Sequence, residues 1–411
     1  MKKTLAFFLA VCTLFALTAC GAPEAPTAEP IYIPAASEAP AENPVDAVST
    51  APAEESEEAE CPAEPVVSVS VYTEREYEYT EMDFCLMSYV CACPSVSVAG
   101  RESAERAIQA SIEEKNTQLR DGMGEELLTM ARENYELRME EGVPLEEWYG
   151  GYAMERSVQE IWSGAELLSL ELADYSFSNG AHGYTAFSGW NYDLTTGAEL
   201  ALSDLSERED FTDFCLRRVT ELSCDSALYD PAMFFEEYEE YLDDVVSDGL
   251  WYCTEEGLTF LANAYLLAPY AAGCLRFTID WAELTEWLKP EYRYEPTASG
   301  SALPGALAEE LSGCTFAVDD GTNGQGQPIV FTAGEELRRV SLRHLDYWEY
   351  ADTFENRDVL FYVSRLGAGE SVGVAAWVPD VLPNLGIFTG KTGRTIFQSG
   401  KDGSLLLEAI G

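Results

Sequence analysis

The chain has 411 residues, of which 47% are hydrophobic and 12% aromatic, so a wholly disordered chain is excluded and more than one domain is expected. Its 73 acidic residues outnumber 24 basic ones, and the formal net charge is −49. Such a surface repels phosphate groups, which excludes nucleic acid as a partner, whereas cationic molecules are attracted. The acidity fits either of two roles, general solubility near an anionic envelope or recognition of a cationic ligand.

The first 20 residues predict export. Lys2 and Lys3 precede an apolar run over residues 4–19, which is shorter than the roughly 20 residues of a membrane-spanning helix. Leu17-Thr18-Ala19-Cys20 resembles the bacterial lipobox, whose cysteine is acylated after the leader is removed. We therefore expect a lipoprotein signal peptide over 1–19, lipid on Cys20, and a protein held on the extracytoplasmic face of the cell membrane. An ordinary secretory signal with an incidental Cys20 is the alternative.

Residues 20–65 predict an acidic tether rich in proline, alanine and glutamate. From Gly21 to Pro65 there is no lysine or arginine, and nine of the 19 prolines lie in this stretch. Like-charge repulsion and proline keep such a segment extended, with a reach on the order of 100 Å at about 3.1 Å per residue.

The cysteines beyond Cys20 are nine in number, so they cannot all pair within one chain. Cys85, Cys91 and Cys93 alternate along an expected strand, which favours buried free thiols. Scattered disulfides such as Cys215–Cys224 are the alternative. No Cys-x-x-Cys pair with zinc spacing occurs, and no metal or cofactor is expected.

The hydrophobic pattern then predicts mixed elements. Strands are expected over 66–72 and 84–93, and a helix from Ser103 towards Met139, ended by Gly142-Val143-Pro144. Residues 157–172 are predicted to be strand-rich. Two further strands are predicted within 174–205, one before and one after residues 180–183.

Helices are predicted over 211–222 and 231–246, followed by strands at 258–261 and 275–279 and a short helix at 281–288. Residues 291–304 predict a linker. Short strands at 329–332, 359–364, 372–378, 395–398 and 405–407, the last two joined by a turn at 401–403, predict a β-rich C-terminal domain over 305–411. Residues 66–300 carry a net charge of −33 and residues 301–411 only −7, so the acidity is concentrated in the central region.

Residues 174–205 carry a family resemblance. Tyr175-Ser176-Phe177-Ser178-Asn179-Gly180-Ala181-His182-Gly183, with the blocks 191–200 and 202–205, resembles the domain of unknown function shared by the lysozyme-sensing anti-sigma factor RsiV and the peptidoglycan deacetylase PdaC. The resemblance resumes at residues 251–258 and 268–273. It implies an α+β fold with an N-terminal domain over 66–172 and a C-terminal domain of unknown function over 173–290, before the β-rich tail.

Two departures from the family limit what the resemblance implies. Asn179 stands where the family usually has glycine, and asparagine tolerates the positive φ of a tight turn. The sequence also shows neither a cytoplasmic sigma-binding segment nor a deacetylase domain. The resemblance therefore implies an extracytoplasmic binding or sensing module.

Candidate ligand-binding residues lie in the family block: Asn179, Gly180, His182, Gly183 and Tyr184. The alternative role of His182 is to bond the local backbone of its turn. His344 is predicted to be a strand-end residue, and Gly386–Thr392 a hairpin loop, because its glycine spacing is one residue short of a phosphate-binding loop. Residues 236–244 lack the ligand spacing of a calcium loop, so we expect a solvated acidic helix face.

No catalytic residue is predicted, because the sequence shows no histidine pair, nucleophile elbow or nucleotide fingerprint. The expected function is non-catalytic binding of an extracytoplasmic ligand, either a basic protein such as lysozyme or a cell-wall component. A peptidoglycan-modifying enzyme or accessory protein that acts through carboxylates is the second hypothesis. A structural envelope protein whose C-terminal domain pairs with another exported chain is the third.

Overall fold

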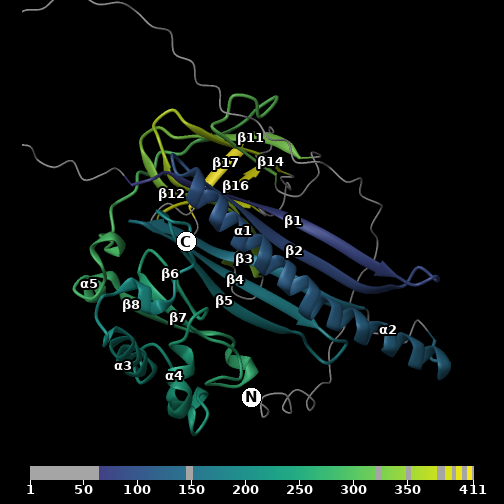
Figure 1. The fold of residues 1–411 in the computed structure, drawn as a ribbon. Helices are drawn as coiled ribbons and strands as arrows, with labels where there is room; N and C mark the ends of the chain where they lie inside the picture. Colours follow the sequence, from purple (N-terminus) through teal and green to yellow (C-terminus); the bar gives the residue numbers. More distant parts are fainter. Residues whose placement is uncertain are drawn as a thin grey trace, which may run out of the picture. The chain divides into compact units, whose positions relative to one another are not determined.

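The computed structural model describes residues 64–144, 151–319, 326–348, 353–376, 385–390, 395–399 and 405–409 (Figure 1). Over these ranges the chain forms sheets of ten, four and three strands together with helices, which confirms the predicted α+β class. Among the described helices, none is both long and apolar enough to cross a membrane.

The large sheet combines strands from both ends of the chain. Its spatial order is β17-β16-β15-β12-β13-β1-β2-β3-β4-β5. Neighbouring strands are antiparallel except β2 and β3, which are parallel. The strands are β1 (Val67–Tyr79), β2 (Cys85–Val98), β3 (Tyr152–Gly164), β4 (Leu167–Phe177), β5 (Tyr184–Asp193), β12 (Leu337–Trp348), β13 (Thr353–Leu366), β15 (Leu385–Thr389), β16 (Thr395–Ser399) and β17 (Leu405–Ala409).

The connection from β2 to β3 is the long helical segment predicted from the sequence. It consists of α1 (Glu102–Leu119), a π-helical turn (Arg120–Gly124) and α2 (Glu125–Glu140). Ala104, Ile108 and Ile112 recur at helical spacing and are buried. Ile108 and Ile112 pack against the sheet with Leu168, Leu170 and Leu172 of β4. Figure 1 shows α1 and α2 lying one after the other over the sheet, and both contact β2.

A three-stranded sheet packs on the other face of β4 and β5. It contains β6 (Trp251–Cys253), β7 (Gly257–Ala262) and β8 (Leu275–Asp280), with α3 (Phe211–Ser223), α4 (Leu242–Val245) and α5 (Trp281–Leu284) around it. Successive strand residues point to opposite faces, so Ser169 of β4 faces this sheet. Its hydroxyl accepts a 2.7 Å hydrogen bond from the Cys253 amide.

The four-stranded sheet has the order β10-β14-β11-β9. Its strands are β9 (Gly305–Leu307), β10 (Phe316–Asp319), β11 (Gln327–Thr332) and β14 (Ser371–Ala376). Its buried residues, such as Ile329, Phe331 and Val374, share one hydrophobic cluster with residues of β12 and β13.

The predicted helix over 231–246 is wrong. The chain instead forms 3-10 turns at Pro231–Met233 and Tyr238–Tyr241 and then the short α4. Phe234 is extended, with ψ 154°, and interrupts any continuous helix. Closely spaced carboxylates weaken such a helix. The Phe234 and Tyr238 rings stack on each other without it, with centroids 4.4 Å apart.

The C-terminal strands predicted from the sequence are present, but β9, β10, β12 and β15 were not predicted. β15 contains Gly386, so the hairpin loop expected over 386–392 is wrong at its start, and His344 pairs with Leu385 inside β12 rather than at a strand end. The turn at 401–403 lies outside the described residues. The expected domain boundaries stay a prediction, although β4 spans residues 172 and 173 and β13 joins β1.

The predicted linker starts with packed residues, since Tyr292 and Tyr294 are buried in the hydrophobic cluster of the three-stranded sheet. The eight cysteines within the described residues are free thiols. Cys91 and Cys93 are buried, as favoured from the sequence, whereas Cys85 is half-buried. Cys215 is buried and Cys224 exposed, and no disulfide joins them.

Candidate functional site

The loop between β4 and β5 carries the candidate residues predicted from the sequence. Asn179 has φ 60°, which confirms the expected left-handed turn at this position. Asn179 is half-buried, whereas Gly180 is exposed. The side chain of Asn179 ends in a buried oxygen, Oδ1, that has no hydrogen-bond partner in the described residues.

His182 is exposed and lies against a second loop. Its Nδ1 is 2.9 Å from the Gly183 carbonyl oxygen, so the ring bonds the local backbone as the alternative prediction held. The ring also stacks on Tyr270, with centroids 4.0 Å apart and an interplanar angle of 24°. The sequence pattern gave no reason to place Tyr270 beside His182.

Gly183 immediately precedes β5, and Tyr184 is the first residue of that strand. A Cβ on Gly183 would lie 2.1 Å from the Tyr175 ring, so any larger residue requires the Tyr175 side chain to move. The Tyr184 hydroxyl donates to the Ala264 carbonyl at 3.5 Å. Burial, followed by the nearby Cys274 and Tyr265, raises the pKa of Tyr184. The Tyr184 hydroxyl therefore joins the start of β5 to the loop that follows β7.

The second loop, residues 263–274, connects β7 and β8. Asn263 anchors its start: the Asn263 side chain accepts from the Phe187 amide at 2.7 Å and donates to the Phe187 carbonyl at 2.9 Å. Tyr265 follows with φ 71° and is 52% exposed. A tyrosine in this backbone region costs on the order of 1–3 kcal/mol, and such strain is concentrated at functional sites.

His182, Tyr265 and Tyr270 together form what we call the aromatic rim. Tyr270 is 37% exposed. Its ring stacks on His182. The centroids of the Tyr270 and Tyr265 rings are 5.8 Å apart, and the two ring planes are tilted by 32°. The rim thus presents adjacent ring faces and edges to solvent. Sequence reasoning included His182 and the block that contains Tyr270, but it missed Tyr265, which no local motif marks.

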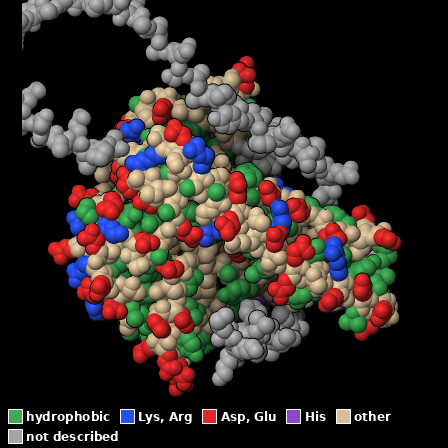
Figure 2. All heavy atoms as spheres, viewed as in Figure 1, with side chains coloured by type: hydrophobic (Ala, Val, Ile, Leu, Met, Phe, Trp, Pro, Cys, Tyr) green, Lys and Arg blue, Asp and Glu red, His purple; other side chains and the backbone are tan. Residues whose placement is uncertain are grey.

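An acidic stretch lies beside the rim. We call residues 236–244 the acidic segment. The Phe235 amide, immediately before it, donates to the Leu267 carbonyl in the rim loop at 2.9 Å. The acidic segment has six exposed carboxylates: Glu236, Glu237, Glu239, Glu240, Asp243 and Asp244. None of these six forms an ion pair with a described residue. Phe235 and Tyr241 are 40% and 46% exposed among them. Figure 2 shows acidic side chains over much of the visible face.

A buried polar cluster lies behind the rim. Glu171 on β4 is only 4% exposed. Arg276 on β8 donates to its Oε1 at 2.6 Å, and the guanidinium lies 4.8 Å from the Phe187 ring centroid. Burial raises the pKa of Glu171, although Arg276 and Tyr252 oppose this shift. Glu160, its register partner on β3, accepts from Arg343 at 2.7 Å.

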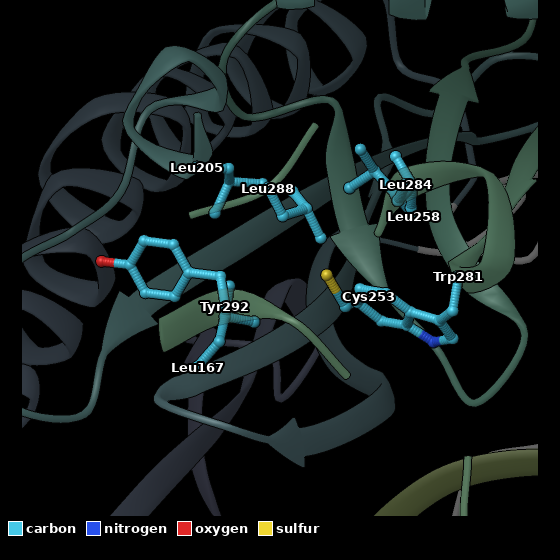
Figure 3. Close-up of a pocket in the computed structure, with 8 residues that line it drawn as sticks. All are labelled: Leu167, Leu205, Cys253, Leu258, Trp281, Leu284, Leu288 and Tyr292. Carbon is cyan, nitrogen blue, oxygen red and sulfur yellow. The ribbon is translucent and has the colours of Figure 1, made fainter. Parts of the chain in front are cut away.

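The hydrophobic core around the three-stranded sheet contains a small apolar space of about 10 Å³. Figure 3 shows the Cys253 thiol and the leucines around it, with the Tyr292 hydroxyl pointing away. That hydroxyl donates to Asp193 at 2.7 Å. A space of this size holds about one water molecule, so it is core packing rather than a ligand site.

Metal ligands are not gathered anywhere in the described ranges, where no three His, Cys, Asp or Glu side chains could hold an ion together. The predicted lipid-attachment residue, Cys20, lies outside the described residues. The roles of the loop residues stay predictions.

Comparison with known proteins points to one family. The family model described as "Protein of unknown function (DUF3298)" matches residues 230–282, which include the acidic segment and both rim tyrosines. No curated protein matches the sequence.

Two crystal structures are similar in part. A member of the DUF3298 family from Bacteroides fragilis NCTC 9343 is 18% identical with a TM-score of 0.40, and the match covers 55% of this chain and 94% of that one. A DUF3298 family protein from Pseudomonas aeruginosa PAO1 is 18% identical with a TM-score of 0.33, covering 54% and 95%. At this similarity neither assigns a role to a residue here. What is shown is that residues 230–282 match a DUF3298 domain, a domain of unknown function.

Proposed function

We propose that this chain is a non-catalytic, lipid-anchored protein of the extracytoplasmic surface that binds a cationic protein. The binding surface would be the acidic segment together with the aromatic rim. One observation carries the proposal: the hydrogen bond from Phe235 to Leu267 places the start of the acidic segment, whose six carboxylates form no ion pair with a described residue, next to the loop with Tyr265 and Tyr270.

Electrostatics supports a cationic partner. Exposed carboxylates without cations of their own leave a local negative field, which attracts a basic protein and speeds its encounter. The field is screened by salt over about 10 Å at 0.1 M. Affinity for the partner should therefore fall as ionic strength rises.

The aromatic rim adds direct ring contacts to the long-range attraction between charges. Tyrosines are enriched among the residues that dominate binding energy at interfaces. Their ring faces also attract guanidinium and ammonium groups by cation–π contact. Arginines and lysines of a basic partner thus have both carboxylates and rings to meet.

Lysozyme is the most specific candidate partner. It is small and basic, and the sequence resembles the domain that the lysozyme-sensing anti-sigma factor shares with PdaC. The DUF3298 match is compatible with this resemblance but assigns no ligand.

Calorimetric titration of residues 21–411 with lysozyme tests the proposal. We expect binding at low salt that weakens at physiological salt. The variant with Glu236, Glu237, Glu239 and Glu240 changed to Gln should bind at least about tenfold more weakly. Its control carries Gln at four exposed glutamates of α1 and α2: Glu113, Glu114, Glu133 and Glu136. Equal losses in both variants, or no binding by the native protein, would reject this surface.

The rim is tested separately by Tyr265→Ala and Tyr270→Ala. Each should raise the dissociation constant several-fold through faster dissociation. The control is Tyr79→Ala, since Tyr79 is similarly exposed at 49% but lies on β1. Unchanged dissociation rates in both rim variants would leave charge as the only contribution and remove the rim from the proposal.

The membrane location rests on the lipobox at Cys20. The native protein isolated from its host should have a diacylated cysteine at its N-terminus by mass spectrometry. Cys20→Ala should release the protein from the membrane fraction. An unmodified N-terminus in the cytosol would contradict the location.

A carboxylate enzyme acting on peptidoglycan is the second candidate. Glu160 and Glu171 are register partners on one sheet face, and burial raises the pKa of Glu171, as in acid–base pairs of glycoside hydrolases. Release of fragments from purified cell walls, lost in Glu171→Gln, would favour this candidate. Each carboxylate is held by an arginine, which favours a structural role instead.

A further inference from the structure

A separate hollow lies between the β1–β2 hairpin and the helices above it. Its volume is about 150 Å³. The floor is apolar: Tyr89 and Met87 of β2, 6% and 5% exposed, with Leu128 of α2. Three carboxylates surround it: Glu76 and Glu78 of β1 and Glu125 of α2.

The π-helical turn Arg120–Gly124 shapes this hollow. At Gly124 the backbone passes close to the sheet, and an added Cβ would lie 3.7 Å from the Tyr89 ring. Inserted π turns recur at functional sites because they shift side chains out of helical register. Here the turn places Arg120 at the edge, 5.3 Å from the Tyr89 ring centroid.

The charges around the hollow do not cancel. Arg120 pairs with Glu74 at 2.8 Å and with Glu76 at 3.0 Å. Arg132 pairs with Glu78 at 2.6 Å. Glu125 has no ion-pair partner in the part of the chain that the structure describes. Two arginines therefore face four carboxylates, and the mouth of the hollow is negative.

We propose that this hollow binds a small primary alkylammonium ion. The ammonium group would donate to Glu125 and to the free carboxylate oxygens of Glu76 and Glu78, while the alkyl chain would cover Met87, Tyr89 and Leu128. A carboxylate ligand would meet the excess negative charge, and a neutral alcohol would leave Glu125 without its cation. The volume suits a chain of a few carbons and is too small for a drug-sized ligand.

Three probes of equal length isolate the charge: n-butylammonium, n-butanol and butyrate. Binding to the full chain is measured by ligand-observed NMR at low salt. We expect saturable one-to-one binding of n-butylammonium, with a dissociation constant on the order of millimolar for so small a ligand. The alcohol and the carboxylate should bind at least about tenfold more weakly.

Matched variants separate the hollow from general attraction to an acidic protein. Glu125→Gln should weaken n-butylammonium about tenfold, whereas Glu133→Gln should not, because Glu133 is exposed on the same helix and does not line the hollow. Leu128→Phe keeps every charge and fills the space, so it should also abolish binding. Circular dichroism confirms that each variant is folded.

The proposal fails under any of three results. Equal weakening by Glu125→Gln and Glu133→Gln would mean non-specific charge attraction. Unchanged binding in a folded Leu128→Phe variant would place the ligand elsewhere. Tighter binding of butyrate than of n-butylammonium would mean that Arg120 selects an anion. None of these results depends on whether the aromatic rim binds a cationic protein.

Discussion

Gly183 lies so close to Tyr175 that a side chain has no room there. Gly183→Ala would place its Cβ 2.1 Å from the ring and force the loop or the ring to move. We expect a loss of about 1–3 kcal/mol in unfolding free energy, measured by urea denaturation. Gly122→Ala is the control, since nothing lies within 4 Å of its added Cβ. Equal stability of the two variants would show that the loop is looser than described.

Arg156 and Asp174 form a buried ion pair. Arg156 is 6% exposed, donates to both Asp174 oxygens at 2.6 Å and contacts Asn116 of α1 at 2.8 Å. Asp174→Ala leaves a buried guanidinium without its counter-ion, so we expect a loss of about 3–5 kcal/mol in unfolding free energy. Asp210→Ala breaks the exposed pair with Arg208 and should change stability little. Similar losses would contradict the burial of Arg156.

Asp193 gives a pH-dependent prediction. Burial raises its pKa, but hydrogen bonds from Tyr292 and Thr196 outweigh burial and hold the pKa below its usual 3.8. A depressed folded-state pKa gives stability that is present above pH 3.8 and is lost as the pH falls through the folded value. The stability difference between the native protein and Asp193→Asn should therefore shrink below pH 3.8. A difference independent of pH would refute this role.

The sequence could predict local backbone chemistry at single residues. Asn179 in the place of a family glycine predicted a positive φ, and the φ of 60° confirms it. Tyr265 could not be predicted in the same way. Its positive φ opposes the preference of its own side chain, and the Tyr265 amide donates to the Ala268 carbonyl in the folded loop, which no sequence pattern marks.

Tyr362 of β13 forms hydrogen bonds with Ser163 of β3, although the two residues are 199 positions apart in the sequence. The Tyr362 hydroxyl accepts from the Ser163 amide at 3.0 Å and lies 3.1 Å from the Ser163 hydroxyl. Tyr362→Phe leaves this buried amide without an acceptor, and we expect a loss of about 1–3 kcal/mol in unfolding free energy. Tyr241→Phe, at an exposed tyrosine, should be neutral. No loss in Tyr362→Phe would contradict the packing of β13 on β3.

Elements with a clean period were predictable. The spacing of Ala104, Ile108 and Ile112 predicted α1, and alternating valines predicted β1. β12 was missed because Arg338, Arg339 and Arg343 interrupt its apolar alternation. Arg339 also has a positive φ of 53°, and the register of β12 with β13 shifts between Leu342 and Arg343 and again between Arg343 and Leu345. The failed helix at 231–246 had helical spacing but no energetic reason to stay continuous.

At the scale of the whole molecule, the ten-stranded sheet predicts cooperative unfolding. β1 pairs with β2 on one side and with β13 on the other, and Arg339 of β12 forms a 2.5 Å ion pair with Glu255. We expect one calorimetric transition for residues 64–411. A protein shortened to residues 64–300 should melt lower or aggregate, because β1 loses its partner β13 and becomes an open edge strand. Two separate transitions would show independent domains.

The hydrophobic pattern could predict a mixture of helices and strands, the family resemblance implied the α+β class, and composition showed the central concentration of acid. They could not predict that the two ends of the chain share a sheet. Strand pairing between distant segments depends on tertiary packing, and nothing in the local pattern of 66–72 specifies residues 361–363 as its partner.

The pairing of β1 with β13 cannot form until late in the synthesis of the chain. The Val67 amide bonds the Ser364 hydroxyl across 297 residues, which a ribosome needs roughly 15–60 s to add at about 5–20 residues per second. Over that interval one edge of the first strand stays open, with Val67, Val69 and Val71 unprotected. Newborn chains are therefore vulnerable to aggregation at this edge until β13 has emerged, and a folding helper that covers this edge should raise the yield.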